Sequence, residues 1–286
     1  MWRFEYVEPR SVRELVAFLD KNGKKSAILA GGTDIVPKLT KRTARPQYVV
    51  NIKGIKGLSS ISYSERSGLR IGALVTLREI EKSPVIARYY PVLAEAAHTV
   101  GSMQVRNLAT MVGNICNAAP SADTVPSLLT LGASLKIVGS SGTRSVALNE
   151  FYLAPWKTTL KPGEYVEEIV IPKVALGTGL CYMKHSIRKA MDMALVGVAV
   201  RLSLDKDGVC KDASIGLGAT APTPLRAYKA EGVLKGERVT EELLERAGKV
   251  ASTEARPRSY PEYKREMVQE FTLRAGRVAL ERALGK

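Results

Sequence analysis

The sequence predicts an α+β protein, because helical and strand patterns occur in separate groups along the chain. One helix and two apolar strands come first, strand–turn–strand patterns occupy the middle, and three strands followed by two helices end the chain. The 286 residues can bury on the order of 70–75% of the unfolded surface, which is enough for two or three subdomains.

The first elements form a small α/β unit. A capping box at residues 11–14 starts a helix whose apolar residues follow at helical spacing, and Gly23 stands where a C′ glycine ends a helix. Apolar strands follow at 26–30 and 48–52, and the unit ends near Gly57. The first strand runs directly into a glycine loop.

The middle of the chain reads as strands joined by short turns, with a few helices between them. A serine–proline pair before residue 85 is a good helix start, and the glycine–serine turn at 139–142 indicates a hairpin. The expected strands are 58–63, 69–73, 134–138, 144–147 and 165–171, and the expected helices start at 84 and span 125–131.

The last third reads as strands followed by helices. A linker over 173–179 leads to strands at 179–185, 194–204 and 209–217, and helices start at Thr240 and Pro261. The second of these helices is expected to bury one stripe, formed by Met267, Phe271, Arg274 and Val278.

Charge and hydropathy limit the classes of function. The net charge is +15, but the basic residues are dispersed among acidic ones and no basic run is interleaved with stacking aromatics. Solvated helix faces or an acidic partner therefore explain the charge better than nucleic acid. No apolar run reaches the roughly 18–20 residues of a membrane span, and the N-terminus lacks a secretory signal, so we expect a cytoplasmic protein. Scarce glutamine beside abundant Lys, Arg and Glu hints at a thermophilic source.

The cysteines and histidines do not form a metal site of their own. Cys116, Cys181 and Cys210 are widely spaced, without a C-x-x-C pair, which excludes a self-contained iron–sulfur or structural zinc site. Two histidines are too few for a histidine-based centre. His98 ends a helical run, where a cationic imidazole is mildly favoured, and we prefer this role to a catalytic one.

Two glycine-centred loops lie far apart in the sequence. The first is Ala30–Asp34, after an apolar run, and the second spans Thr110–Asp123 between two apolar runs as a turn of small residues. Because glycine lacks a Cβ, its backbone can approach a ligand closely and turn N–H groups toward phosphate oxygens. Either loop alone is an ordinary turn more often than a site, but together they indicate two halves of a site for a large phosphorylated cofactor.

The polar side chains of these loops suit a cofactor that carries phosphates and hydroxyl groups. Thr110 offers a hydroxyl, Asn114 offers an amide that donates and accepts, and Gly113 permits close approach. A carboxylate repels a pyrophosphate. We therefore expect Asp34 and Asp123 either to accept from the hydroxyls of a ribose or ribityl chain or to cap their own turn or helix.

A third glycine-rich segment, Gly216–Ala221, matches the G-x-G-x-x-A pattern of dinucleotide binding and follows a strand. However, a Pro-Thr-Pro sequence comes next, and no parallel strand with an acidic ribose-binding residue follows. We therefore expect a glycine-rich strand end. Lys184, on a predicted strand, is either a solvated lysine or a cation near the pyrimidine edge of a flavin, where it would stabilise the anionic reduced form.

Taken in order, these motifs resemble the FAD-binding medium subunit of the molybdenum hydroxylases, a family that includes carbon monoxide dehydrogenase, xanthine dehydrogenase and archaeal aldehyde oxidoreductases. The family has an AGGT-type loop and a T-[IL]-G-G-N core followed by an A-[SA]-P-x-x-D tail. The resemblance covers essentially the whole chain. The matching segments are Ala30–Thr33, Thr110–Asn114, Ala118–Asp123, Ile71–Thr76, Lys189–Asp192 and Leu217–Arg226.

The resemblance implies the two-domain FAD-binding fold of the vanillyl-alcohol oxidase type. Two N-terminal α+β subdomains would span 1–57 and 58–173, and a C-terminal antiparallel sheet with helices would span 174–286. The FAD pyrophosphate would lie on both glycine loops, with Val166 beside the flavin or adenine and Lys184 at the isoalloxazine. The implied FAD-binding residues are Leu29, Ala30, Gly31, Gly32, Thr33, Asp34, Ile35, Thr110, Val112, Gly113, Asn114, Asn117, Asp123, Val166 and Lys184.

The resemblance also implies an electron-transfer subunit of an oxidoreductase, in which no side chain of this chain need be catalytic. An iron–sulfur small subunit with 2Fe-2S clusters and a molybdopterin large subunit would be its partners, in a dimer of heterotrimers. Electrons would pass through FAD on this chain to an external acceptor. A free-standing FAD oxidoreductase of the same fold and a basic nucleic-acid-binding protein are the alternatives.

Two positions depart from the family pattern. Val112 stands where the family has the first glycine of a pair, so the turn there must accommodate a β-branched residue. Some relatives carry acidic residues after the lysine, where nicotinamide docks, whereas this chain has Arg188–Met191. This second departure argues against NAD as the acceptor.

Overall fold

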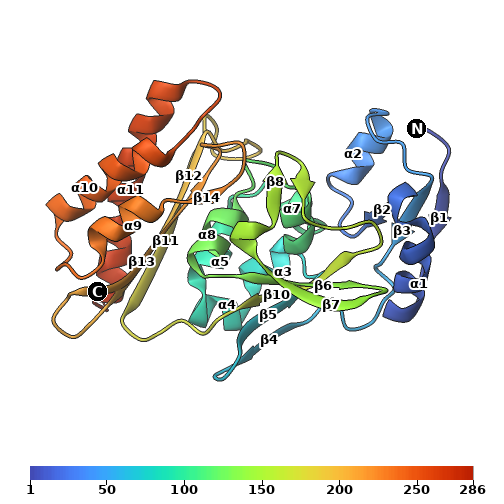
Figure 1. Ribbon diagram of the computed structural model, residues 1–286, viewed down its shortest axis with the longest axis horizontal. Coiled ribbons are helices and arrows are strands. Elements are labelled where there is room, and N and C mark those ends of the chain that lie inside the picture. Colours follow the sequence, from blue (N-terminus) through green and yellow to red (C-terminus); the bar gives the residue numbers. More distant parts are fainter. Residues whose placement is uncertain (286) are drawn as a thin grey trace.

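The computed structural model describes residues 1–285 and confirms the α+β class (Figure 1). Within these residues, sheets of three, five and four strands follow one another along the chain, and a hairpin adds two short strands. The N-terminal unit lies at one end of the molecule, the C-terminal sheet with its long helices lies at the other end, and the central unit lies between them (Figure 1).

The N-terminal unit is a parallel sheet, in the order β1-β3-β2, with two helices. Ser11 caps the first helix as predicted, with the Glu14 backbone N–H donating to its Oγ at 3.2 Å. Strand β1 and helix α2 were not anticipated. The elements are β1 (Glu5–Val7), α1 (Val12–Asn22), the 3₁₀ turn η1 (Gly23–Lys25), β2 (Ser26–Leu29), α2 (Ile35–Thr40) and β3 (Tyr48–Asn51).

Helix α1 ends at Asn22 and Gly23 is its C-cap, so the expected position of the helix end is confirmed. The φ of Gly23 is −54°, which is right-handed, so Gly23 begins a 3₁₀ turn and is not a left-handed C′ residue. A Cβ at this position would lie 2.3 Å from the backbone nitrogen of Gly163. The glycine is therefore needed for the close approach of another segment.

The central unit is an antiparallel sheet, in the order β4-β5-β10-β6-β7, together with several short helices. The hairpin between β6 and β7 is confirmed. The strand expected from residue 58 begins only at Ile61, because the carbonyl of Leu58 accepts from Leu74 outside the ladder. The elements are β4 (Ile61–Ser64), β5 (Gly68–Gly72), α3 (Leu77–Lys82), α4 (Pro84–Tyr89), α5 (Pro91–His98), α6 (Met103–Arg106), α7 (Met111–Cys116), α8 (Thr124–Thr130), β6 (Ser134–Gly139), β7 (Gly142–Ala147), η2 (Leu148–Glu150), β8 (Tyr152–Ala154), β9 (Lys157–Thr158) and β10 (Tyr165–Ile171).

The C-terminal unit is an antiparallel sheet, in the order β11-β12-β13-β14, and confirms the three expected strands to within two residues at each end. Helices α9, α10 and α11 lie on the outer side of this sheet, while α5 and α8 of the central unit contact its strands from the inner side (Figure 1). The elements are β11 (Thr178–His185), β12 (Val196–Leu204), β13 (Cys210–Gly218), β14 (Leu225–Arg226), α9 (Tyr228–Leu234), α10 (Glu241–Glu254) and α11 (Pro261–Ala283).

The buried face of α11 differs from the predicted stripe. Arg274 is exposed, and Met267, Phe271 and Val278 are only partly buried. The helix approaches its neighbours so closely that small side chains are required: a Cβ on Gly179 would lie 1.9 Å from the carbonyl oxygen of Ala279. The face that is fully buried consists of Lys264, Val268, Thr272, Ala275, Gly276 and Ala279.

The segment Gly216–Ala221 ends strand β13, which is antiparallel to both of its neighbours, so the expectation of a glycine-rich strand end is confirmed. A Cβ on Gly216 would lie 2.4 Å from the carbonyl oxygen of Pro126 in α8. A Cβ on Gly218 would lie 2.9 Å from the Pro126 ring. These glycines therefore let α8 pack directly on the sheet.

Among residues 1–285, no helix combines the length and the apolar character that crossing a membrane requires. The same residues contain no cluster of three or more His, Cys, Asp or Glu side chains that could hold a metal ion.

Candidate functional site

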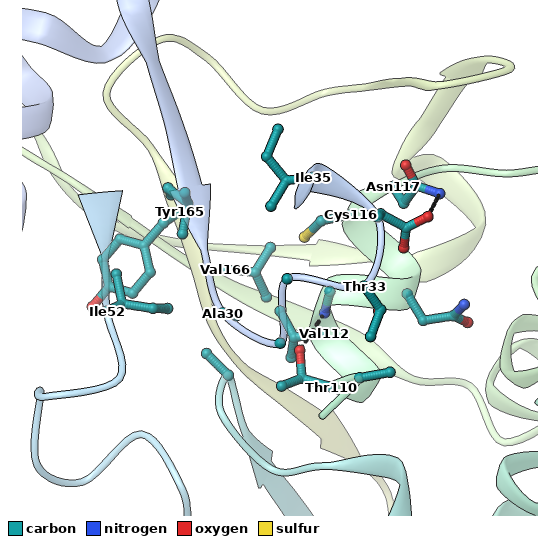
Figure 2. A pocket seen from close by; sticks show the side chains of 18 of the residues that line it. Ala30, Thr33, Ile35, Ile52, Thr110, Val112, Cys116, Asn117, Tyr165 and Val166 are labelled. Atoms are coloured by element: carbon teal, nitrogen blue, oxygen red, sulfur yellow. Dashed lines mark hydrogen bonds between the residues drawn. The ribbon is translucent and has the colours of Figure 1, made fainter. Parts of the chain in front are cut away.

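A cavity of about 500 Å³ is lined by residues of both the N-terminal and the central units (Figure 2). This volume lies within the range of about 300–1,000 Å³ typical of small-molecule sites. Both glycine loops contribute to the wall. The predicted residues that line the cavity are Ala30, Gly31, Gly32, Thr33, Asp34, Ile35, Thr110, Val112, Gly113, Asn114, Asn117 and Val166.

The first glycine loop leaves the end of the parallel strand β2 and packs against the segment that precedes the second loop. A Cβ on Gly31 would lie 2.1 Å from the carbonyl oxygen of Leu108. Gly32 has a φ of +82°, a conformation that strains any residue with a Cβ. The two glycines are therefore required for different reasons. Gly31 allows the first loop to pack against the segment before the second loop, and Gly32 allows the backbone to turn.

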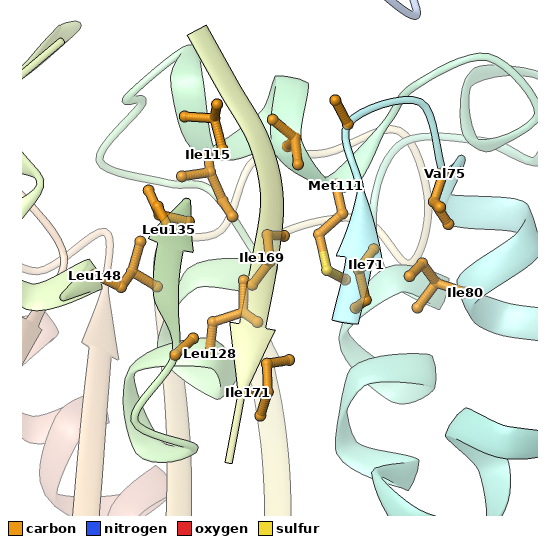
Figure 3. Packing of buried hydrophobic residues seen from close by; sticks show 14 of the residues in the cluster. Ile71, Val75, Ile80, Met111, Ile115, Leu128, Leu135, Leu148, Ile169 and Ile171 are labelled. Atoms are coloured by element: carbon orange, nitrogen blue, oxygen red, sulfur yellow. The ribbon is translucent and has the colours of Figure 1, made fainter. Parts of the chain in front are cut away.

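The second loop begins with helix α7, which the sequence does not predict, and the turn of small residues follows it over 117–123. Thr110 is its N-cap and accepts from the backbone N–H of Gly113 at 3.0 Å. Met111 and Ile115 are fully buried and point into the central core beside β5 and β10 (Figure 3). The apolar spacing of α7 is therefore helical, but it extends over too few residues to be recognised.

Val112 needs no unusual backbone, because it lies in the first turn of α7. Its side chain is 5% exposed and belongs to the central core while it also lines the cavity. Where the family pattern has a glycine, Val112 thus contributes an apolar side chain to the wall of the cavity.

A chain of hydrogen bonds joins the two loops. The Asn117 amide donates to Asp34 Oδ1 at 3.0 Å, and the Lys38 ammonium donates to Asn117 Oδ1 at 2.7 Å. Asp34 occupies the N-cap position of α2 but makes no side-chain cap bond, so the capping alternative for it is wrong. Asn117 instead holds the carboxylate and the ammonium group on its two sides.

Lys38 was missed from the sequence, although it lies only four residues after Asp34. Pro37 reads as a break, but it lies in the first turn of α2, where proline loses no helical hydrogen bond. Of the cavity-lining residues that the structure describes, Lys38 and Asp34 are the charged ones.

One part of the cavity wall is apolar. Tyr165, Ile52 and Val166 lie near one another on this side (Figure 2), and Ile28 and Leu160 also line the cavity. Apart from Val166 they were missed, because they lie in ordinary apolar segments and only the tertiary fold shows which side chains face the cavity. A flat apolar ring suits this wall, whereas the glycine loops and Asn117 suit polar groups.

Cys116 lines the cavity with its thiol between Ile35 and Val166 (Figure 2). Burial raises the pKa of this thiol to about 12. The thiolate form is therefore negligible near neutral pH, and Cys116 is not a nucleophile.

Three predicted residues do not line this cavity: Leu29, Asp123 and Lys184. Asp123 occupies the N-cap position of α8 without capping it, so that alternative is also wrong. Its carboxylate accepts from the Lys184 ammonium at 2.8 Å and from the Tyr182 hydroxyl at 3.0 Å. Burial raises the pKa of the Asp123 carboxyl, and the charge and hydrogen bond of Lys184 oppose this rise.

Lys184 is also bonded on its remaining sides. Its ammonium group donates to the carbonyls of Thr99 at 3.0 Å and Asp192 at 2.8 Å, in addition to Asp123. An ammonium group has three donors, so all of them are used. The pair is buried, with both side chains 8% exposed, and it joins the central unit to strand β11 of the C-terminal sheet.

The arrangement is that of a binding site. Its wall combines glycine backbone, amide and hydroxyl groups on one part with an apolar surface on another. The lining residues described here contain no histidine and no nucleophile paired with a base, so the site binds and orients a ligand that brings its own chemistry.

Two protein families match the chain in succession. Residues 2–174 match the family described as FAD binding domain in molybdopterin dehydrogenase. Residues 181–279 match the family described as CO dehydrogenase flavoprotein C-terminal domain.

Curated relatives match over nearly the full length. The chain is 33% identical to the carbon monoxide dehydrogenase medium chain of Afipia carboxidovorans, over 98% of each chain. It is 32% identical to the glyceraldehyde dehydrogenase medium chain of Sulfolobus acidocaldarius, over 95% of this chain and 96% of that one. A solved carbon monoxide dehydrogenase structure from Hydrogenophaga pseudoflava matches with a TM-score of 0.94 and 33% identity, over 98% of each chain.

Proposed function

Because the chain belongs to the FAD-binding medium subunits of the molybdenum hydroxylases, we propose that it holds FAD in the cavity between its N-terminal and central units. The observation that carries this proposal is that two glycine loops, about 80 residues apart in the chain, line one cavity.

The wall of the cavity fits the parts of FAD. The glycine loops, Thr33 and Asn114 offer backbone and side-chain donors to the phosphates and hydroxyls, and the surface around Tyr165 and Val166 offers contact to a flat ring. When bound, FAD supplies one- and two-electron chemistry between the iron–sulfur clusters of a partner subunit and an external acceptor. The residues of this chain bind it, orient it and exclude water from it.

We assign the buried pair of Asp123 and Lys184 to the end of the site nearest the C-terminal sheet. The contact of Lys184 with the isoalloxazine stays a prediction from the resemblance. In the arrangement described above, such a contact requires Lys184 to exchange one of its three hydrogen bonds for one to the flavin.

The relatives are medium chains and subunits of larger enzymes, so we propose that this chain assembles with an iron–sulfur small subunit and a molybdopterin large subunit. A dimer of heterotrimers in the cytoplasm is our expectation for the complete enzyme. Native mass spectrometry of the purified complex, with metal analysis for iron and molybdenum, tests the composition and the stoichiometry.

Titration of the purified full-length chain with FAD tests the cofactor assignment. We expect one FAD per chain, measured by calorimetry. Gly32→Val should abolish this binding, since Gly32 has a positive φ in the cavity wall. Gly232→Ala is the matched control, because a Cβ there meets nothing within 4 Å. A chain that binds no FAD would overturn the proposal.

A further inference from the structure

The ammonium group of Lys38 is the one cation among the described residues that line the cavity, and its side chain is half-buried there. Lys38 lies in α2, after the first glycine loop. The Gly32, Thr33 and Gly113 positions line the same cavity.

Lys38 has donors to spare. An ammonium group carries three N–H donors, and in the part of the chain that the structure describes, Lys38 uses one of them, toward Asn117. Lys184 differs, because its three donors are all bonded to protein acceptors. Of these two lysines, Lys38 is therefore the one whose charge and donors are available to a ligand.

Asn117 keeps this charge available. Its Oδ1 accepts from Lys38, while its Nδ2 donates to the Asp34 carboxylate. The amide thus bridges the ammonium and the carboxylate, and the charge of Lys38 opposes the rise that burial causes in the pKa of Asp34. A direct ion pair would cancel the positive charge in the cavity.

We propose that Lys38 is the cationic ligand of the FAD pyrophosphate and that Asn117 positions its ammonium group. A pyrophosphate diester carries two negative charges at neutral pH, whereas the glycine loops contribute only uncharged N–H groups. Charge-assisted hydrogen bonds are roughly twice as strong as neutral ones, so a single lysine adds substantially to the affinity. This inference rests on the proposed FAD site and names the group that neutralises the phosphates there.

The test compares ligands with and without phosphates on the full-length chain by calorimetry. Lys38→Met should weaken FAD and ADP binding by about 10- to 100-fold, as expected for a hydrogen bond to a charged group. Binding of adenosine should change by less than about twofold in the same variant. Lys38→Arg, which keeps the charge, should retain most of the affinity for FAD.

Two further measurements separate binding from structure. Lys41→Met removes the same charge from the exposed end of α2 and should leave the affinity for FAD unchanged. The ³¹P resonances of bound FAD should shift in Lys38→Met but not in Lys41→Met. Thermal unfolding without FAD should be alike in both variants, which shows that the fold is intact.

The outcomes distinguish this inference from the proposed function. If the unaltered chain binds no FAD, both are overturned. If the unaltered chain and Lys38→Met bind FAD equally, or if Lys38→Met weakens adenosine as much as FAD, only the assignment of Lys38 to the pyrophosphate is overturned. If Lys38→Met does not fold, equal ³¹P resonances and equal FAD affinity in Lys38→Gln and the unaltered chain overturn it.

Discussion

Two glycine-rich segments of this chain follow a strand, yet they serve different purposes. In 30–34 the chain leaves the end of a parallel strand and turns into the wall of a cavity. In 216–221 the chain completes an antiparallel strand, and helix α8 occupies the space beside its glycines. The second segment matches a dinucleotide motif letter by letter and does not line the cavity.

A glycine in either segment indicates that another group lies close to the backbone. It does not identify whether that group is a ligand or another part of the same chain. At Gly216 the neighbour is Pro126 of the same chain, and at Gly31 it is the Leu108 carbonyl. The feature that distinguishes the two segments is the cavity: residues 30–34 line it, whereas residues 216–221 do not.

Weakening the junction between the central unit and the C-terminal sheet, which carries segment 216–221, should have the largest effect. Lys184→Met leaves the buried Asp123 carboxylate with the Tyr182 hydroxyl but without a cationic partner at the junction with the C-terminal sheet, and should lower the free energy of unfolding by about 3–5 kcal/mol. Adding Asp123→Asn should recover part of this loss, because no charge is then unpaired. Denaturant unfolding of the chain without FAD measures both. A double variant as unstable as the single one would contradict this explanation.

Making the second loop more like the first should cost somewhat less. Val112→Gly restores the glycine of the family pattern but removes an apolar side chain that is 5% exposed and introduces glycine into α7. We expect a loss of about 2–4 kcal/mol from the sum of both effects. Val112→Ala should cost less than Val112→Gly in the same unfolding experiment. A stabilised glycine variant would show that the valine is strained there.

The same substitution in both segments compares them directly. Gly31→Ala and Gly216→Ala each place a Cβ within 2.5 Å of a backbone oxygen, at 2.1 and 2.4 Å. Each should destabilise the chain by about 1–3 kcal/mol. Only Gly31→Ala should also weaken FAD binding, by at least about tenfold, because only that loop lines the cavity. Equal FAD affinities in both variants would remove the distinction between the segments.

The smallest expected effect is a pH dependence that arises from Asp123 in the second glycine loop and has no counterpart in segment 216–221. Burial raises the pKa of Asp123 above its ordinary 3.8, against the opposing charge of Lys184. Since the folded pKa is raised, this carboxyl favours folding below pH 3.8 and loses that contribution as pH rises through the folded pKa. The free-energy difference between Asp123→Asn and the unaltered chain should therefore change with pH in this window.

Segment 216–221 contains no ionisable side chain, so Thr220→Val is the matched variant for the pH experiment. Thr220 is fully buried, and its hydroxyl has no hydrogen-bond partner within the described residues. We expect its difference from the unaltered chain to be constant over the same pH range. A pH-dependent difference for Thr220→Val would assign the effect to general acid unfolding and not to Asp123.

The sequence predicts elements well where a long pattern repeats. The strands β11, β12 and β13 each have eight or nine residues, and their alternation and turns locate them to within two residues. Helix α7 has six residues, and its two fully buried side chains, Met111 and Ile115, are too few to show a period. The stripe of α11 was misplaced because close packing there favours small residues, which hydrophobicity patterns rank low.

The residues of the site also fall into two groups, those that a local sequence motif predicts and those that only the tertiary fold identifies. The glycine loops were found because glycine, threonine and asparagine form a local motif, and twelve of the predicted residues line the cavity. Lys38 and Tyr165 were missed because nothing local distinguishes a lysine or an aromatic residue that faces a cavity from one that faces solvent or core. The role of Lys184 at the flavin stays a prediction, and its bonds to Asp123 and two carbonyls depend on how the units meet.

The cavity lies between two units of one chain, and this position affects the stability of the chain before it assembles with other subunits. A ligand held there stabilises only the arrangement in which both units are in place, and at one hundred times its Kd it adds about 2.7 kcal/mol to the free energy of unfolding. With FAD as this ligand, the loaded chain should therefore resist proteolysis longer than the chain without FAD.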